Sequence, residues 1–151
     1  MTAREGTSKE EIVDRAMDVG GRTCLYAALS TLKYLAMSGR VGHLTTGIAS
    51  LLSIRPILTL RDGQRQMLER VRTQRKAWAR IIRLTQDALD DRGPERLAIV
   101  PVDALAEALL FEEQLRAEVL CPQTIIRAEL TPGLSVHTGG GLVGVAAVAP
   151  A

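Results

Sequence analysis

The residues of this chain best suited to acid–base chemistry are its two histidines, His43 and His137. His43 follows a glycine at the expected start of a helix and has no carboxylate nearby in the sequence, so we interpret it as a surface or capping residue. His137 has a different setting. It stands at the end of residues 134–137, which are expected to form a short apolar strand. Thr138 and three glycines follow it. His137 is therefore the stronger candidate for a functional site.

Gly139, Gly140 and Gly141 could bring backbone N–H groups together where they bind an anion, and Thr138 adds a hydroxyl donor. Glycine clusters also occur in ordinary hairpins, so the pattern alone leaves both interpretations open. The Gly-Lys-Ser/Thr of a Walker-type phosphate loop is missing, and no helix is expected after the glycines, as a dinucleotide fingerprint would require. The sequence therefore predicts a possible anion site without a nucleotide motif.

Other residue types offer little catalytic chemistry. Cys24 and Cys121 lie far apart, and neither has a second Cys or a His nearby, so no zinc site or redox pair is predicted. We interpret both as buried thiols in a reducing cytoplasm. No nucleophile or carboxylate stands at a suggestive spacing from His137, so we predict that the chain is not an enzyme. A small hydrolase or transferase with His137 as general base is the alternative.

Length and composition indicate one compact domain over residues 1–151. The chain is 46% hydrophobic and 24% charged, which is typical of a globular protein. Its polar N-terminus excludes a secretory signal, and no apolar run is long enough to span a bilayer, so a cytoplasmic location is expected. Aromatic residues make up 3% of the chain, too few for the base-stacking platforms of single-stranded nucleic-acid binders, and no nucleic-acid partner is predicted.

Charge is unevenly distributed along the chain. Residues 61–83 carry eight basic and two acidic side chains, whereas residues 84–151 carry four basic and ten acidic ones. Such a basic segment can guide an anionic partner, although the two segments can also neutralise each other in the folded domain.

Periodicity and capping signals predict an α/β fold with a mixed sheet and helices packed on it. Helices are expected from the Ser8 capping box to Val19, over 32–38, over 44–52, from Thr73 to Gly93-Pro94, and over 103–118. In the helix that begins at Thr73, the residues expected to face inward are Trp78, Ile81, Ile82, Leu84, Ala88 and Leu89. Strands are expected over 23–29, 54–60, 66–71 after a turn at Asp62-Gly63, 97–100, 124–130 and 142–148. Strands 97–100 and 124–130 flank a helix, which predicts that they run parallel.

Several segments, in this order and spacing, strongly resemble the DegV family of bacterial proteins. They are Thr31-Leu-Lys-Tyr-Leu35, Ser38-Gly-Arg-Val-Gly42, Leu51-Leu-Ser-Ile-Arg-Pro-Ile-Leu58, Asp62-Gly63, Val71-Arg-Thr73 and His137-Thr-Gly-Gly-Gly141. The resemblance covers nearly the whole chain but only the C-terminal half of a family member. It therefore implies a DegV-like C-terminal domain without the family's N-terminal α/β domain, which supplies hydroxyl groups to the ligand.

The resemblance implies binding of a long-chain fatty acid, with no cofactor and no metal. Some members, called FakB, present the bound acid to a kinase, FakA, which phosphorylates its carboxylate. By resemblance, His137 and Thr138 would contact the carboxylate, and Gly139, Gly140 and Gly141 would shape the loop beside it. The family's usual pattern is His-Thr-Gly-Pro-Gly, and here Gly140 replaces the proline, which loosens the loop.

The resemblance also assigns apolar and basic positions. Five residues would form one wall of the acyl tunnel: Leu44, Ile48, Leu51, Leu52 and Ile54. Packing in the core is the ordinary role of such a stripe, so we expect a mixture of core and tunnel wall. Arg40 and Arg72 match basic positions that meet the kinase in the family.

A remaining alternative is a truncated product that folds but does not bind lipid by itself, or that pairs with a separately encoded N-terminal half. In either case the isolated half should expose an apolar surface where the absent domain would lie, and it should tend to self-associate.

Overall fold

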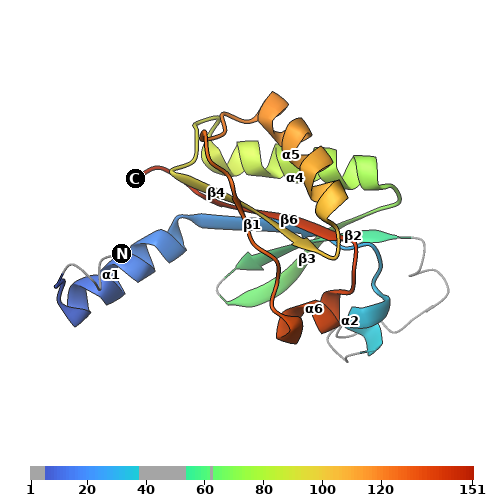
Figure 1. Ribbon diagram of the computed structural model, residues 1–151, viewed down its shortest axis with the longest axis horizontal. Helices are drawn as coiled ribbons and strands as arrows, with labels where there is room; N and C mark the ends of the chain where they lie inside the picture. Colours follow the sequence, from blue (N-terminus) through green and yellow to red (C-terminus); the bar gives the residue numbers. More distant parts are fainter. Residues whose placement is uncertain (1–5, 38–53, 62) are drawn as a thin grey trace.

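The computed structural model describes residues 6–37, 54–61 and 63–151, and these residues form a six-stranded mixed sheet with helices packed on it (Figure 1). The strand order is β3-β2-β1-β6-β4-β5. The strands are β1 (Thr23–Ala28), β2 (Arg55–Arg61), β3 (Gln64–Val71), β4 (Arg96–Val102), β5 (Ile126–Arg127) and β6 (Leu142–Val148). Neighbouring strands are antiparallel except β4 and β5, which are parallel. The predicted fold class is therefore confirmed.

The β2–β3 hairpin forms as predicted. Gly63 has φ +70°, a conformation that glycine adopts at little cost. Asp62, the other half of the predicted turn, lies outside the described residues, as do Gly39 to Gly42 and the helix predicted over 44–52. Pairing between the two strands shifts register between Ile57 and Leu58.

Helices α4 (Gln74–Leu89) and α5 (Leu105–Glu118) cover one face of the sheet (Figure 1). Thr73 caps α4 as predicted, by accepting a hydrogen bond from the Lys76 N–H. Trp78 of α4 meets Phe111 of α5 in an edge-to-face contact, with ring centroids 5.7 Å apart. Together with side chains from the strands, the two helices form the larger hydrophobic core.

Two details of α4 differ from the prediction. Ala88 is exposed, because Thr85 and Leu89, both fully buried, fill the inward side of the last turn. The buried Thr85 hydroxyl donates to the Ile81 carbonyl, which satisfies it inside the helix. The helix also ends before Gly93-Pro94, because Asp90 adopts a left-handed conformation with φ 50°.

The β4–α5–β5 unit has the predicted parallel pairing, but both later elements are shorter than expected. Helix α5 begins at Leu105 because Asp103 has φ 45°, which is incompatible with a helix. Strand β5 comprises Ile126 and Arg127 instead of residues 124–130, since its pairing with β4 spans two register positions.

On the opposite face of the sheet, two short helices lie side by side at one end: α2 (Lys33–Met37) and α6 (Pro132–Thr138) (Figure 1). The strand predicted over 134–137 is wrong, because these residues belong to α6. Pro132 at the first helical position has its φ preset for a helix, and the Ser135 N–H closes the first turn onto the Thr131 carbonyl. Beneath these helices lies a smaller core formed by Leu29, Leu32, Leu35, Val102 and Leu142.

Helix α1 (Lys9–Gly21) projects beyond the sheet, and none of its residues is buried (Figure 1). Its predicted capping box is present, with the Ser8 hydroxyl accepting from the Glu11 N–H and the Glu11 carboxylate accepting from the Ser8 N–H. The helix continues through Gly20 and Gly21, where the sequence predicted that it would stop, and ends at Arg22.

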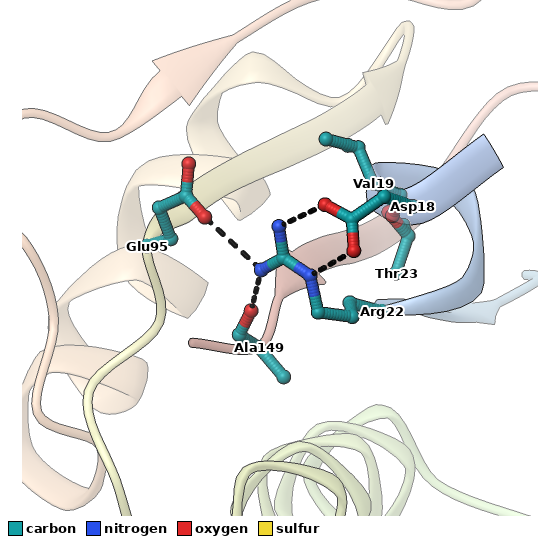
Figure 2. Close-up of polar contacts among 6 residues, drawn as sticks. All are labelled: Asp18, Val19, Arg22, Thr23, Glu95 and Ala149. Atoms are coloured by element: carbon teal, nitrogen blue, oxygen red, sulfur yellow. Dashed lines mark hydrogen bonds and ion pairs between the residues drawn. The ribbon is translucent and has the colours of Figure 1, made fainter. Parts of the chain in front are cut away.

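Arg22 fixes the C-terminal end of α1 beside the start of β4 and the end of β6 (Figure 2). Its guanidinium donates two hydrogen bonds to Asp18, at 2.7 and 3.2 Å, one to Glu95 at 3.0 Å, and one to the Ala149 carbonyl. The Arg22 carbonyl in turn accepts from the Ala149 N–H. The hydrogen bonds from Arg22 lower the pKa of the Asp18 carboxyl below its usual value.

This lowered pKa predicts a pH-dependent contribution to stability. A carboxyl with a lower pKa in the folded state stabilises that state above its unfolded pKa, and the contribution is lost as the pH falls through the folded pKa. We expect Asp18→Asn to lower the melting temperature at pH 7. The difference from the unchanged chain should shrink progressively below about pH 4. Thermal unfolding monitored by circular dichroism across this range measures the difference, and a difference that did not change with pH would contradict the assignment.

Gly144 permits the close approach of β6 to β1. An added Cβ at Gly144 would lie 3.0 Å from the Ala27 Cβ and 3.2 Å from the Tyr26 carbonyl oxygen. Gly144→Ala should therefore push the two central strands apart and lower the free energy of unfolding by about 1–3 kcal/mol. Urea denaturation measures this, with Gly20→Ala in α1 as the matched control, because a Cβ there meets nothing within 4 Å. Equal effects of the two substitutions would contradict this explanation.

Candidate functional site

An open pocket of about 550 Å³ lies between α2 and α6. It is lined by Tyr34, Met37, Ser135, Val136, His137, Gly139 and Gly140. The pocket thus brings together the predicted histidine and two of the three predicted glycines. His137 projects from the last turn of α6 instead of from the end of a strand, and it is partly buried.

The glycine turn after α6 depends on the absence of side chains. Gly139 and Gly141 have φ 73° and 82°, in the left-handed region that favours glycine. A Cβ at Gly139 would lie 2.2 Å from Cδ2 of Tyr34, so the tyrosine ring of α2 packs directly against the bare backbone of the turn. This contact positions α2 beside the turn and forms one side of the pocket.

Hydrogen bonds hold the turn against the ends of β1 and β4. The Ser30 hydroxyl donates to the Gly140 carbonyl at 2.7 Å, and the Gly141 N–H donates to the Val102 carbonyl at 2.8 Å. The Gly139 N–H donates to the Ser135 carbonyl at 2.8 Å. Two of the three glycine N–H groups are therefore used within the protein, whereas the Gly140 N–H has no acceptor among the described residues.

Thr138 lies beside the turn, partly buried, and its hydroxyl donates to the Ser135 carbonyl at 3.2 Å. A hydroxyl can rotate, so binding an anion would require Thr138 to exchange this donor bond for one to the ligand. Side chains with donor groups at or beside the pocket include the His137 imidazole and the hydroxyls of Tyr34, Ser135 and Thr138.

Sequence reasoning missed Asp103, Tyr34 and Ser30 as neighbours of the glycine turn. Asp103 is exposed and has its Oδ2 3.3 Å from the place where a Cβ on Gly140 would lie. Its left-handed φ of 45° is uncommon for a residue other than glycine and directs the carboxylate at the turn. No local motif predicts these contacts, because β1, β4 and the turn meet through the order of strands in the sheet.

Of the five residues predicted to form the acyl-chain wall, the structure describes Ile54. Ile54 is partly buried and packs against the smaller core. The other four predicted wall residues, Leu44, Ile48, Leu51 and Leu52, lie outside the described residues, as do His43 and the predicted docking residue Arg40. Arg72, the other predicted docking residue, is exposed between β3 and α4.

The sheet face opposite α4 and α5, which we call the open face, carries partly exposed apolar residues of β1 and β2. Ala28 and Ile57 point into the larger core, so their chain neighbours Ala27 and Leu58 point to the open face. The surface continues from Leu58 along β2 to Leu60, whose side chain is 47% exposed. An exposed apolar surface of this kind was expected for an isolated half.

A second pocket, of about 510 Å³, lies at the end of the open face farthest from His137, where α1 joins β1. It is lined by Ala16, Met17, Gly20, Gly21, Thr23, Leu25, Leu60 and Gly63. The open face therefore runs from the pocket beside His137, at the C-terminal end of β1, to the second pocket, at the N-terminal end of β1.

The described residues contain no group of three or more His, Cys, Asp and Glu side chains that could hold a metal ion. Both cysteines are free and partly buried, and burial raises the pKa of the Cys24 and Cys121 thiols, which disfavours reactive thiolates. Within the same part of the chain, no helix is both long enough and apolar enough to cross a membrane.

Comparison with known proteins places these features in a family. The family model described as an uncharacterised protein, DegV family, matches residues 1–150. A DegV domain-containing protein of Corynebacterium glutamicum is 32% identical over 97% of this chain and 53% of its own length. Another, of Streptomyces coelicolor, is 34% identical over 95% of this chain and 51% of its own length. The chain thus spans about half the length of these relatives.

Solved structures have the same fold. A DegV family protein from C. glutamicum superposes with a TM-score of 0.87 at 31% identity, covering 99% of this chain and 56% of that protein. A fatty acid binding DegV family protein from Streptococcus agalactiae gives 0.81 at 24% identity, covering 100% and 53%. A DegV family protein from Eubacterium eligens, loaded with heptadecanoic acid, gives 0.81 at 22% identity, covering 99% and 53%. The chain belongs to the DegV family.

Proposed function

We propose that this chain is a fatty-acid-binding module without catalytic activity of its own. In this proposal the pocket beside His137 receives the carboxylate, and the adjoining end of the open face contacts the acyl chain. The observation that carries the proposal is this juxtaposition of an imidazole-edged pocket with partly exposed apolar residues of the sheet. Relatives from S. agalactiae and E. eligens, described respectively as fatty acid binding and as loaded with heptadecanoic acid, support it.

Burial of the acyl chain would supply most of the affinity. Each methylene removed from water contributes about 0.8 kcal/mol, and aliphatic walls achieve this without directional contacts. Ala27, Leu58 and Ile54 are partly buried and lie along the border of the smaller core, where a chain leaving the pocket would pass. The positions predicted over 44–52 would complete this wall.

The carboxylate requires hydrogen-bond donors, because an unpaired charge next to apolar walls is costly. In this proposal the His137 imidazole and a rotated Thr138 hydroxyl would contact the carboxylate, and the Gly140 N–H lies at the same pocket. Asp103 lies beside Gly140, with its Oδ2 3.3 Å from the place of an added Cβ, and its negative charge would repel a carboxylate bound close to that side of Gly140. The head group would therefore bind closer to His137 than to Asp103.

We further propose that the chain acts as the C-terminal domain of a DegV-type protein, in the cytoplasm of a bacterial cell, and that it presents the acid to a FakA-like fatty acid kinase. The open pocket would leave the carboxylate accessible to a second protein. Arg72 lies exposed in the basic segment 61–83, where it could contact an acidic or nucleotide-loaded partner. An N-terminal α/β domain of the kind found in the family would cover the open face and complete the acyl site.

The central test is whether the chain carries lipid. We expect organic extraction of the purified protein, followed by mass spectrometry, to yield long-chain fatty acid. Protein stripped of lipid should bind a fluorescent fatty acid that unlabelled acid displaces. If stripped protein bound no acid under any condition in which it is folded, the chain would be a non-binding fragment and the proposal would be wrong.

His137→Ala should weaken fatty-acid binding about ten- to hundredfold, because hydrogen bonds to a charged group contribute about 1.5–3 kcal/mol. The methyl ester of the same acid lacks the charge and should bind more weakly than the acid. His137→Ala should change the affinity for the ester little. Titration calorimetry of both ligands measures the difference, and circular dichroism verifies folding. Parallel losses for acid and ester would indicate damage to the apolar wall and would remove His137 from the carboxylate site.

A further inference from the structure

Asp103 places a negative charge at one edge of the pocket that holds His137. Its Oδ2 lies 3.3 Å, and its Cβ 3.5 Å, from the position that a Cβ on Gly140 would occupy, and Gly140 lines the pocket. The carboxylate can lie this close because residue 140 has no side chain. Asp103 therefore packs along the bare backbone of the glycine turn.

The backbone keeps Asp103 in this position. Its φ of 45° is a left-handed conformation, which is unfavourable for most residues other than glycine. The preceding residue, Val102, accepts a hydrogen bond of 2.8 Å from the Gly141 N–H, so the end of β4 is joined to the turn. These constraints keep the Asp103 backbone, and with it the negative charge, next to Gly140.

The contacts of the described residues do not give the Asp103 carboxylate a structural role. Asp103 precedes α5, but the N-cap residue of that helix is Ala104, and no side chain in the described part of the chain caps the helix start. Within the same residues, the Asp103 carboxylate forms no hydrogen bond and no ion pair. No contact in this part of the structure therefore neutralises its charge.

We propose that Asp103 determines which head-group charge the pocket accepts, and that it selects singly charged carboxylates over doubly charged phosphate monoesters. This inference rests on the proposed fatty-acid site. The repulsion between two charges is proportional to their product, so a dianion loses twice the binding free energy that a monoanion loses, and a neutral head group loses none. A single-chain lipid phosphate is thus excluded more strongly than a fatty acid of equal length.

Three ligands with the same alkyl chain test this inference: dodecanol, dodecanoic acid and dodecyl phosphate. At about pH 8 their head groups carry no charge, one charge and nearly two charges, because carboxyls ionise at about pH 4 and the second pKa of a phosphate monoester is about 6. Displacement of a fluorescent fatty acid measures their affinities for the lipid-stripped chain and for Asp103→Asn. Asparagine also tolerates a left-handed conformation, so this substitution removes the charge and keeps the backbone.

We expect Asp103→Asn to tighten the binding of dodecanoic acid about two- to fivefold, which is the usual effect of one exposed charge on another. The affinity for dodecyl phosphate should rise by the square of that factor, roughly four- to twenty-five-fold, and the affinity for dodecanol should not change. Both gains should shrink as the salt concentration is raised, because salt screens exposed charges.

Asp91→Asn is the matched control. Asp91 is also exposed and has φ 55°, but it precedes β4 whereas Asp103 follows it, so the two residues lie at opposite ends of that strand. This variant should leave all three affinities unchanged. The Lys33 ammonium, which lies 5.9 Å from the centre of the Tyr34 ring beside the pocket, is the same in every variant, so its attraction for anions cancels in the comparison.

The dependence on ligand charge separates repulsion from a change in the shape of the turn. Equal gains for the three ligands would mean that Asp103 acts through shape, and they would overturn the inference. So would the absence of a gain for either anion, or equal gains with Asp91→Asn. In each of these cases dodecanoic acid still binds and the proposed function stands, whereas a folded chain that bound none of the three ligands would overturn both.

Discussion

The main physical constraint on this molecule is that the central strands of its sheet are apolar on both faces, while α4 and α5 cover one of these faces. Alternation along each strand sends Ala28 and Ile57 into the larger core and Ala27 and Leu58 to the opposite side. Short helices α2 and α6 cover one end of that side, and the rest is partly open. The pocket at His137 and the exposed Leu60 both follow from this incomplete second layer.

Local signals in the sequence predicted those parts of the fold that local interactions determine. The Ser8 capping box, the Thr73 cap and the β2–β3 hairpin each depend on residues close in sequence, and each forms as predicted. The segment 134–137 was assigned to a strand because four residues are too few to show a helical period. Pro132, which favours a helix start, was the signal that could have corrected this assignment.

The candidate site was predictable in its residues but not in its geometry. His137 and the glycines stand out by type and spacing, and they do line one pocket. The Tyr34 ring against Gly139, the Ser30 hydrogen bond to Gly140 and the approach of Asp103 arise from segments distant in the chain. Sequence alone could not predict that two glycine N–H groups are already bonded within the protein, because their acceptors depend on the helix and strand that flank the turn.

The position of β6 in the sheet has a consequence for how the chain acquires its structure. This strand, residues 142–148, lies between β1 and β4 and pairs Val148 with Thr23. The β1–β2–β3 part and the β4–β5 part of the sheet therefore cannot join until residues 142–148 have been synthesised. During synthesis β1 and β4 would each present an unpaired apolar edge, which makes the nascent chain a natural client for chaperones and predicts slow folding dominated by long-range pairing.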